Sequence, residues 1–408
     1  MIRQLRVTNF RLLRDVQIDF EHDVPTVFIG PNGSGKSTVL EVIDFLSRCA
    51  TDGLQAACVA HGGIASFRTA GANGPVTIET RWAFESDSGT PSSRSWDLAW
   101  RISLAPTRSG EALVKEETLT DLTRKARRPL VTTDDHGIRN VFPEDPSEKP
   151  SQAQGASQLA FETISDPGRF PGLGFLKLVS YCARVVGSLS AAPSWARAGD
   201  GSSPRDSIVI GPKVFLDREG IGLANVLFNL FNDHAAAWAE LESAFRGEFP
   251  FVRRLVFPPI VGGSKIAFAF EDTRFPDRKF FSSEMSDGMI AYLCLLASVL
   301  QPEQRGVLGL DEPGAHLHPS ALRRFMSLVH RAHEGRHLAI VTHSNALLDE
   351  LQAPERSIRV VEAGKDGATI RKLDAAALAA WRKDYSISEM RQTGLLDASN
   401  ASTGDDAR

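Results

Sequence analysis

The sequence has few cysteines and no long apolar segment. Its four cysteines are scattered among 408 residues and form no C-x-x-C pair: Cys49, Cys58, Cys182 and Cys294. A disulfide framework or a zinc site is therefore not expected, and a reducing compartment fits this usage. The longest apolar run, Met289 to Leu300, is too short to span a bilayer, and the N-terminus has no apolar signal-peptide core. We expect a cytoplasmic protein with no membrane partner.

An excess of charge of one sign is also missing. The net charge is -4 and the sequence pI is about 6.2, so no global field attracts nucleic acid, and DNA binding would need a local patch. One basic cluster has the composition to contact a phosphate backbone, although we favour a solvated surface run: Arg124, Lys125, Arg127 and Arg128. No sustained heptad pattern predicts a long coiled coil. With 42% hydrophobic and 24% charged residues, the composition is typical of one or two large globular domains.

A phosphate-binding loop follows the short apolar run "TVFIG", which predicts a buried parallel strand. A helical pattern comes directly after the loop, as the G-x-x-x-x-G-K-[ST] motif requires. Its glycines allow consecutive N–H groups to point at phosphate oxygens, Lys36 would reach the β- and γ-phosphates, and the Ser37 hydroxyl would ligate Mg²⁺. The predicted ATP-binding residues of this loop are Gly30, Pro31, Asn32, Gly33, Ser34, Gly35, Lys36, Ser37 and Thr38.

The residues ahead of this loop alternate in polarity and then turn, which predicts an antiparallel hairpin. Asn9, Phe10, Arg11 and Arg14 lie on its connection. We predict that residues of this connection, Arg11 above all, contact the adenine or the α-phosphate of ATP. Solvated surface arginines are the alternative interpretation.

Two adjacent carboxylates follow a second buried strand, Val307 to Leu310. Asp311 and Glu312 would be unfavourable together at a strand end unless a cation or a reaction used them. We assign Asp311 to the Mg²⁺ shell and Glu312 as the general base for a water that attacks the γ-phosphate. An acidic pair in a turn is the alternative.

Two further motifs accompany these carboxylates. The next buried strand ends at His343, which is placed to contact the γ-phosphate or the attacking water unless it is only structural. Upstream, Ser286 can cap an apolar helix whose first turn contains Asp287 and Gly288, exposing N–H groups and a positive dipole. A well-capped core helix is the alternative there. We predict Lys36, Glu312 and His343 as the catalytic residues.

These motifs occur in the order used by ABC-type ATPases. "NGSGKST", "SDG", "LDEPGAHLHP" and "VTHS" resemble the motifs of the SMC/RecF/OLD-like branch. "DREGIGLANVLFNL", "EFPFVRRLVF" and "ISEMRQTGLL" are similar to its stand-alone ATPases without a Toprim domain. The resemblance implies an α/β fold: a P-loop ATPase head with an N-terminal antiparallel β-layer, a mixed or parallel core sheet flanked by helices, and a large insertion between the Walker A loop and the signature motif.

The resemblance also implies a mechanism. Two units would face each other head to tail, so that the Lys36 loop of one and the Ser286 helix of the other hold each ATP. Since the chain has one copy of each motif, this arrangement needs a homodimer or a related partner. ATP would close the dimer and Glu312-dependent hydrolysis would open it. The glutamine that usually completes the Mg²⁺ shell is not located; Gln55 lies in the right region, and this ligand stays open.

The expected organisation has five parts. These are ATPase lobe I with the Walker A loop at 1–85, a variable and partly loop-rich insertion at 86–212, lobe II with the signature helix at 213–302, the Walker B and switch-histidine strands at 303–372, and a C-terminal helix and flexible tail at 373–408. Further strands are expected over residues 51–84, a strand at 95–106 and a helix over 172–189.

The leading hypothesis is a Mg²⁺-dependent ATPase that dimerises on ATP. By resemblance it would act in DNA maintenance and repair or in anti-phage defence, with DNA or a separately encoded effector protein as candidate partners. The alternative is a slow-hydrolysing, nucleotide-gated scaffold that docks a protein. The ATPase subunit of a transporter fits less well because of the S-D-G signature and the large insertion.

Overall fold

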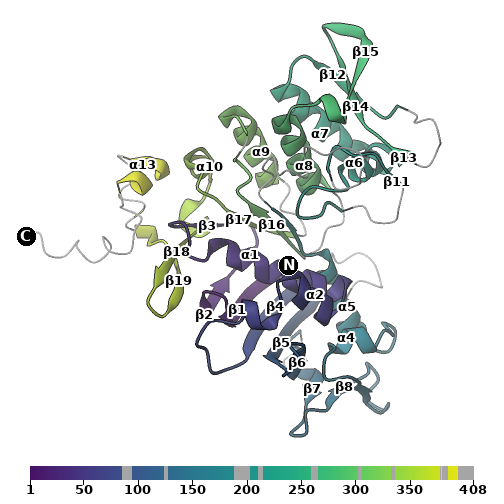
Figure 1. Cartoon of the computed structure of the whole chain (residues 1–408), viewed down its shortest axis with the longest axis vertical. Coiled ribbons are helices and arrows are strands. Elements are labelled where there is room, and N and C mark those ends of the chain that lie inside the picture. Colours follow the sequence, from purple (N-terminus) through teal and green to yellow (C-terminus); the bar gives the residue numbers. More distant parts are fainter. Residues whose placement is uncertain are drawn as a thin grey trace, which may run out of the picture.

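A six-stranded sheet with the strand order β10-β16-β17-β3-β18-β19 lies in the middle of the folded molecule (Figure 1). Its first five strands run parallel, and β19 returns antiparallel to β18. Parallel strands covered on both faces need nearly continuous apolar residues. The predicted strands before the phosphate loop, before Asp311 and before His343 are confirmed. The bounds are β3 (Thr26–Ile29), β10 (Arg184–Val186), β16 (Gly306–Asp311), β17 (Arg336–Val341), β18 (Ile358–Gly364) and β19 (Gly367–Lys372).

The structure is a computed structural model of the whole chain. It describes residues 1–84, 94–123, 127–187, 203–209, 215–258, 265–301, 306–315, 317–331, 336–376, 378 and 385–393. Within these ranges, no helix is both long and apolar enough to cross a membrane.

Side chains of the central sheet alternate between two hydrophobic cores. On β3, Phe28 belongs to the core that includes α1 (Lys36–Thr51), whereas Val27 and Ile29 belong to the core that includes α8 (Asp287–Leu300). Successive residues of a strand point to opposite faces of the sheet. The phosphate-loop helix and the signature helix therefore cover opposite faces (Figure 1).

An eight-stranded antiparallel sheet packs beneath α1, with the strand order β2-β1-β4-β5-β6-β7-β8-β9. The predicted N-terminal hairpin (β1–β2) and the predicted strand at 95–106 (β5) are confirmed. The bounds are β1 (Ile2–Phe10), β2 (Leu13–Asp19), β4 (Val76–Phe84), β5 (Trp96–Pro106), β6 (Ala112–Asp121), β7 (Arg128–Thr133), β8 (Arg139–Val141) and β9 (Ser151–Ala153). Because β5 pairs with β4 across the boundary placed at residue 85, the sheet continues from lobe I into the insertion.

The expectation of further strands from residue 51 was wrong for its first part. Residues there form α2 (Leu54–Ala60) and α3 (Ile64–Phe67), and only β4 is a strand. Leu54, Ala57 and Cys58 are buried at the i, i+3, i+4 spacing of a helix face. Glycines with positive φ precede both helices, which explains why these short elements start where they do.

The insertion also contributes helices and one strand of the central sheet. α4 (Ala160–Thr163) and α5 (Pro171–Cys182) are helical, but the helix expected over 172–189 ends at Cys182. Residues Arg184–Val186 instead form β10, whose two valines suit a pleated strand that pairs with β16.

In the basic cluster, Arg124 and Lys125 lie outside the described residues, and Arg128 forms an ion pair with Glu144 at 3.3 Å.

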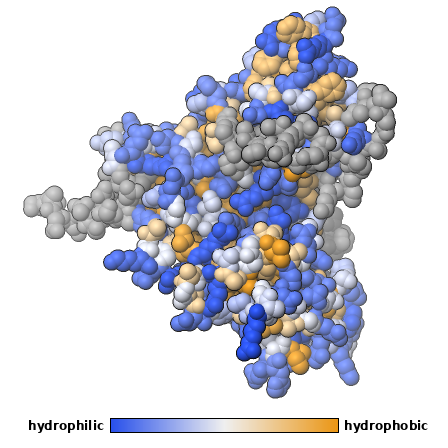
Figure 2. Space-filling model, viewed as in Figure 1, coloured by the Kyte–Doolittle hydropathy of each residue, from blue (hydrophilic) through white to orange (hydrophobic). Residues whose placement is uncertain are grey.

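The helices α6, α7, α8 and α9 contribute to the core on the second face of the central sheet. Beyond them a three-stranded sheet, β12-β14-β15, carries exposed aromatic residues at the tip of the molecule, where pale orange residues gather in Figure 2. The remaining bounds are β11 (Ile208–Val209), α6 (Leu223–Asp233), α7 (Ala235–Glu248), β12 (Val252–Val256), β13 (Lys265–Ile266), β14 (Ala269–Asp272), β15 (Phe275–Phe281), the 3-10 helix Ser282–Glu284, α9 (Pro319–Arg331), α10 (Asn345–Asp349), α11 (Pro354–Ser357) and α13 (Ile387–Gln392). Of the C-terminal helix and tail expected over residues 373–408, the structure describes chiefly α13, and the predicted tail lies outside the described residues.

A buried ion pair links strands of the eight-stranded sheet. Arg139 Nη1 lies 3.1 Å from Glu117 Oε2, and the same carboxylate oxygen accepts a hydrogen bond from the Ala160 N–H at 2.9 Å. Arg139 also donates to the carbonyls of Gly155 and Gln158. Both charged side chains are almost fully buried, so each depends on the other to offset the free-energy cost of losing its hydration.

We predict that Arg139→Ala lowers the free energy of unfolding by about 3–5 kcal/mol, because it leaves Glu117 buried without its cation. Urea unfolding followed by tryptophan fluorescence measures this change. Arg101→Ala is the control, since Arg101 is half exposed and its ion pairs with Glu79 and Glu116 are on the surface; its change should stay within about 1 kcal/mol. Equal effects of the two substitutions would contradict the prediction.

Candidate nucleotide site

The phosphate-loop backbone adopts conformations that require glycine. Gly33 and Gly35 have φ values of 77° and 100°, in the region that L-residues with a side chain avoid. At Gly30 the restriction is a close approach, because a Cβ would lie 2.0 Å from the Val361 carbonyl oxygen of β18. The three predicted glycines therefore let the loop curl tightly between β3 and α1.

Lys36 is the first residue of α1 and is buried inside the loop. Its Nζ donates to the carbonyl oxygens of Gly30 at 3.1 Å and Pro31 at 2.8 Å. Burial lowers the pKa of Lys36, against the opposing field of Glu312. Because the N-cap residue Gly35 has no side chain, the N–H groups of the first turn of α1 are not capped by it. An anion such as a phosphate would satisfy both the ammonium and this turn.

The central sheet brings Ser37 and Asp311 together although they are 274 positions apart. The Ser37 hydroxyl donates to Asp311 Oδ1 at 3.2 Å, and Arg218 Nη2 lies 3.9 Å from Asp311 Oδ2. Burial raises the pKa of Asp311, although the Ser37 hydrogen bond and the Arg218 charge oppose this shift. Burial therefore disfavours the charged form of the Asp311 carboxyl, and a cation bound beside it would offset this cost.

Glu312 and His343 face each other where β16 and β17 end. Glu312 has a φ of 51°, which is uncommon for a residue with a side chain, while its N–H still donates to the Val341 carbonyl at 2.8 Å. Its carboxylate oxygen Oε2 accepts from the His343 N–H at 3.0 Å, and its Oε1 lies 3.8 Å from His343 Nε2. This turn holds the carboxylate beside the histidine ring at the edge of the sheet.

His343 is further held from the C-terminal helix α13. Arg391 donates through Nη1 to the His343 carbonyl at 2.8 Å and through Nη2 to His343 Nδ1 at 3.0 Å. Burial, together with the positive charges of Lys36 and Arg391, lowers the pKa of His343. The ring is therefore neutral near neutral pH.

The signature helix begins as predicted. The Ser286 hydroxyl accepts a hydrogen bond from the Met289 N–H at 3.3 Å, and Asp287 and Gly288 form the first turn of α8. Arg205 fixes this turn: it donates to the Met285 carbonyl and to the Asp287 carboxylate. The helix α8 belongs to the core on the face of the central sheet opposite to that covered by α1.

Residues 26–349 match the family described as "AAA domain, putative AbiEii toxin, Type IV TA system". The match spans well over half of the sequence. The chain belongs to this AAA-domain family.

Two solved structures share the fold of this AAA-domain protein. An Smc head bound to the C-winged helix domain of ScpA has a TM-score of 0.55 and 15% identity, and the alignment covers 93% of this chain and 99% of that one. An Smc head domain with an extended coiled coil, bound to the C-terminal domain of ScpA derived from Pyrococcus furiosus, has a TM-score of 0.52, 12% identity and coverages of 94% and 98%. None of the curated proteins matches the sequence. The predicted head fold, with an antiparallel layer ahead of a parallel core sheet, is confirmed, and the family match agrees with the predicted resemblance to P-loop ATPases.

In this AAA-domain protein the residues of the β1–β2 connection, predicted to contact the adenine or the α-phosphate, differ in burial and in their partners. Arg11 lies in the β1–β2 turn with a φ of 49°, and its Nε is 2.8 Å from Glu41 of α1. Phe10 is buried, and Asn9 donates to the Pro75 carbonyl at 3.0 Å. The contact of Arg11 with ATP stays a prediction, while the structure ties Arg11 to the helix that follows the loop.

Gln55, considered for the open Mg²⁺ position, is engaged elsewhere. Its amide nitrogen donates to the carbonyls of Ala112 and Ser157, both at 2.8 Å, and its oxygen accepts from the Ala112 N–H at 3.0 Å. These bonds fasten α2 to β6. The second magnesium ligand therefore still has no assigned residue.

Three arginines of the site had no predicted role: Arg205, Arg218 and Arg391. Arg218 and Arg391 occur in "DREGIG" and "ISEMRQTGLL", the stretches that resemble the family, which was the only signal available. Arg205 lies in a segment rich in Ser and Pro that favours loop structure. Only the folded chain shows which carboxylate, carbonyl or ring each guanidinium contacts.

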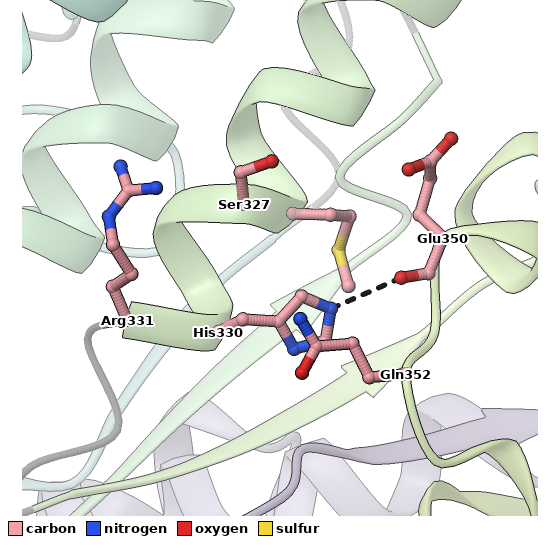
Figure 3. A pocket seen from close by; sticks show the side chains of 6 residues that line it. Ser327, His330, Arg331, Glu350 and Gln352 are labelled. Carbon is pink, nitrogen blue, oxygen red and sulfur yellow. Dashed lines mark hydrogen bonds between the residues drawn. The ribbon is translucent and has the colours of Figure 1, made fainter.

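A separate pocket of about 470 Å³ lies between α9 and the segment after α10 (Figure 3). Its lining residues are Met326, Ser327, His330, Arg331, Glu350 and Gln352. His330 Nε2 is 3.1 Å from the Glu350 carbonyl oxygen, the contact drawn in Figure 3. No predicted site residue lines this pocket, so it is not the nucleotide site.

We predict that Gly30→Ala weakens ATP binding at least about tenfold, since the new methyl group would displace the loop from the Val361 carbonyl. Binding of a fluorescent ATP analogue measures the change. Gly71→Ala is the control, because Gly71 has a φ of 74° but open space where a Cβ would lie, so it introduces backbone strain without a clash. Equal loss of affinity in both variants would mean that strain alone, rather than the close approach, is responsible.

Proposed function

We propose that this AAA-domain protein is a Mg²⁺-dependent ATPase that closes into a homodimer around ATP and reopens after hydrolysis. The arrangement of Glu312 beside Asp311 and His343 is the observation that carries the proposal. At the edge of one sheet, it combines a carboxylate that can accept a proton from water, a carboxylate that can bind a cation, and a neutral imidazole. Adjacent groups with such distinct surroundings are typical of catalytic sites.

The residues fit a magnesium ion. Ser37 Oγ and Asp311 Oδ1 are oxygen donors 3.2 Å apart, and Mg²⁺ is commonly bound by one or two protein oxygens together with phosphate oxygens and water. The raised pKa of the buried Asp311 carboxyl indicates a place where a cation is favourable. When bound, the ion would offset the charge on the β- and γ-phosphate oxygens.

The chain's own groups would perform the proton transfer. Glu312 accepts a proton from the attacking water as the water oxygen bonds to the γ-phosphorus and the bond to the β–γ bridging oxygen breaks. The His343 backbone N–H and the Thr342 hydroxyl both hydrogen-bond to the carboxylate of Glu312, which orients it. Lys36 supplies positive charge from the loop side.

The placement of the two half-sites supports the proposed homodimer. α1 and α8 lie on opposite faces of the central sheet, so the Ser286 turn of one chain is free to meet the phosphate loop of another. Arg205 holds that turn in a fixed shape, and the first-turn N–H groups that the Ser286 hydroxyl does not cap would face the γ-phosphate. This head-to-tail pairing is two-fold symmetric and closes with two ATP molecules.

The biological role that we propose is anti-phage defence, because the family description names a toxin of a toxin–antitoxin system. DNA maintenance or repair is the second candidate role, favoured by the shared fold with Smc heads. Since those heads are bound to ScpA, a separately encoded effector protein is the partner we propose, and DNA is the alternative. A slow-hydrolysing scaffold remains the competing function if turnover proves negligible.

We predict that Glu312→Gln lowers steady-state phosphate release about 100-fold or more and leaves ATP binding intact, because the amide cannot accept the proton. Light scattering of this variant with ATP and Mg²⁺ should show a stable dimer. Glu111→Gln, in the exposed β5–β6 turn, is the matched control and should behave as wild type. Hydrolysis that persists in Glu312→Gln would remove the carboxylate from the mechanism, and a monomer with ATP bound would remove the dimer.

A second prediction tests the shared site by mixing variants. Lys36→Ala and Ser286→Arg should each abolish hydrolysis alone, since every site of the homodimer then lacks one half. A 1:1 mixture should regain about a quarter of wild-type phosphate release, because half of the dimers have one site with both wild-type residues. A mixture no more active than its components would contradict a site shared between two chains.

A further inference from the structure

The C-terminal helix α13 reaches the catalytic edge of the sheet through one side chain. Arg391 lies 48 positions after His343 and contacts it twice: Nη1 donates to the backbone carbonyl and Nη2 to the ring nitrogen Nδ1. Nη1 is also 3.4 Å from Asn345 Oδ1. One planar guanidinium thus holds both the main chain and the ring of the switch histidine.

These contacts decide which ring nitrogen carries the proton. A guanidinium has only donors, so Nδ1 of His343 must be the acceptor. The neutral ring then carries its proton on Nε2, which lies 3.8 Å from Glu312 Oε1 on the catalytic side. In this tautomer the ring presents a donor towards the place of the attacking water and the γ-phosphate.

α13 is attached locally to the element that follows His343. Ile387 and Met390 are buried in the core beneath it, and the Ser388 N–H donates to Asp349 of α10 at 3.0 Å. Ser386 and Glu389 form a capping box at its N-terminus. The helix has only six residues, so its stability depends on this docking rather than on its own hydrogen bonds.

We propose that Arg391 is a positioning residue that fixes His343 as the Nε2–H tautomer, facing Glu312, and that α13 is thereby part of the catalytic site. The consequence for turnover rests on the proposed ATPase function, whereas the tautomer does not. Undocking of α13 would release the ring and let the other tautomer form, so the helix provides a structural means to switch hydrolysis off without touching the nucleotide.

The experiment measures the tautomer and the turnover separately on the full chain. Nitrogen-15 NMR of the histidine side chains at about pH 8, where the ring is neutral, distinguishes Nε2–H from Nδ1–H, and His343→Asn identifies the signal. Wild type should show the Nε2–H form. Arg391→Met should show a mixture or the Nδ1–H form, with kcat lowered about tenfold and the KM for ATP nearly unchanged.

Two variants keep the test decisive. Arg391→Lys retains a donor and should keep the Nε2–H form and most of the kcat, even if Arg391→Met folds poorly. Arg331→Met, an exposed arginine paired with Glu240 on the neighbouring helix, should change neither quantity. An unchanged tautomer in Arg391→Met, or a lost tautomer with full kcat, overturns the proposal. Absent hydrolysis in wild type would overturn the ATPase function instead, and the NMR result would still decide the role of Arg391.

Discussion

The parallel pairing of β16, β17 and β3 is the constraint on which the site depends. Asp311 pairs with Val341, and Val341 pairs with Phe28, so the ends of three strands meet at one edge of the sheet. The phosphate loop, the carboxylate pair and His343 leave from these ends. Ligands of open α/β sheets bind at the carboxyl ends of the strands. A slip in this register would move Asp311 away from Ser37 and separate the two residues of the proposed magnesium site.

The same sheet also separates the two helices that contact ATP from opposite sides in the proposed dimer. Alternating side chains on β3 and its neighbours bury α1 against one face and α8 against the other. The hydrophobic effect therefore both stabilises each lobe and keeps the signature turn away from its own loop. This placement supports the proposed homodimer, in which the phosphate loop and the signature turn of one ATP site come from two chains. The long insertion does not interrupt this plan, because β10 returns to the sheet edge beside β16.

Arginines stabilise the polar parts of the structure, each for a different reason. Arg139 neutralises a buried carboxylate, Arg205 satisfies the backbone around the signature turn, and Arg391 orients a ring. A planar group with several fixed donors suits all three tasks, whereas a lysine would satisfy fewer acceptors at once. Their acceptors are mostly carbonyls and a ring nitrogen, which no sequence pattern identifies.

The sequence by itself determined the elements whose chemistry is local. Gly30, Gly33 and Gly35 restrict the loop, apolar runs produce the buried strands, and Ser286 caps its helix through a hydrogen bond three residues away. It also determined the family, through motifs in a characteristic order. Local patterns failed at residues 54–67 and at Arg184–Val186, where burial against other elements decided between helix and strand. Only the tertiary structure decided the partners of Gln55, Arg218 and Arg391, because these contacts join segments far apart in the chain and depend on how the sheets pack.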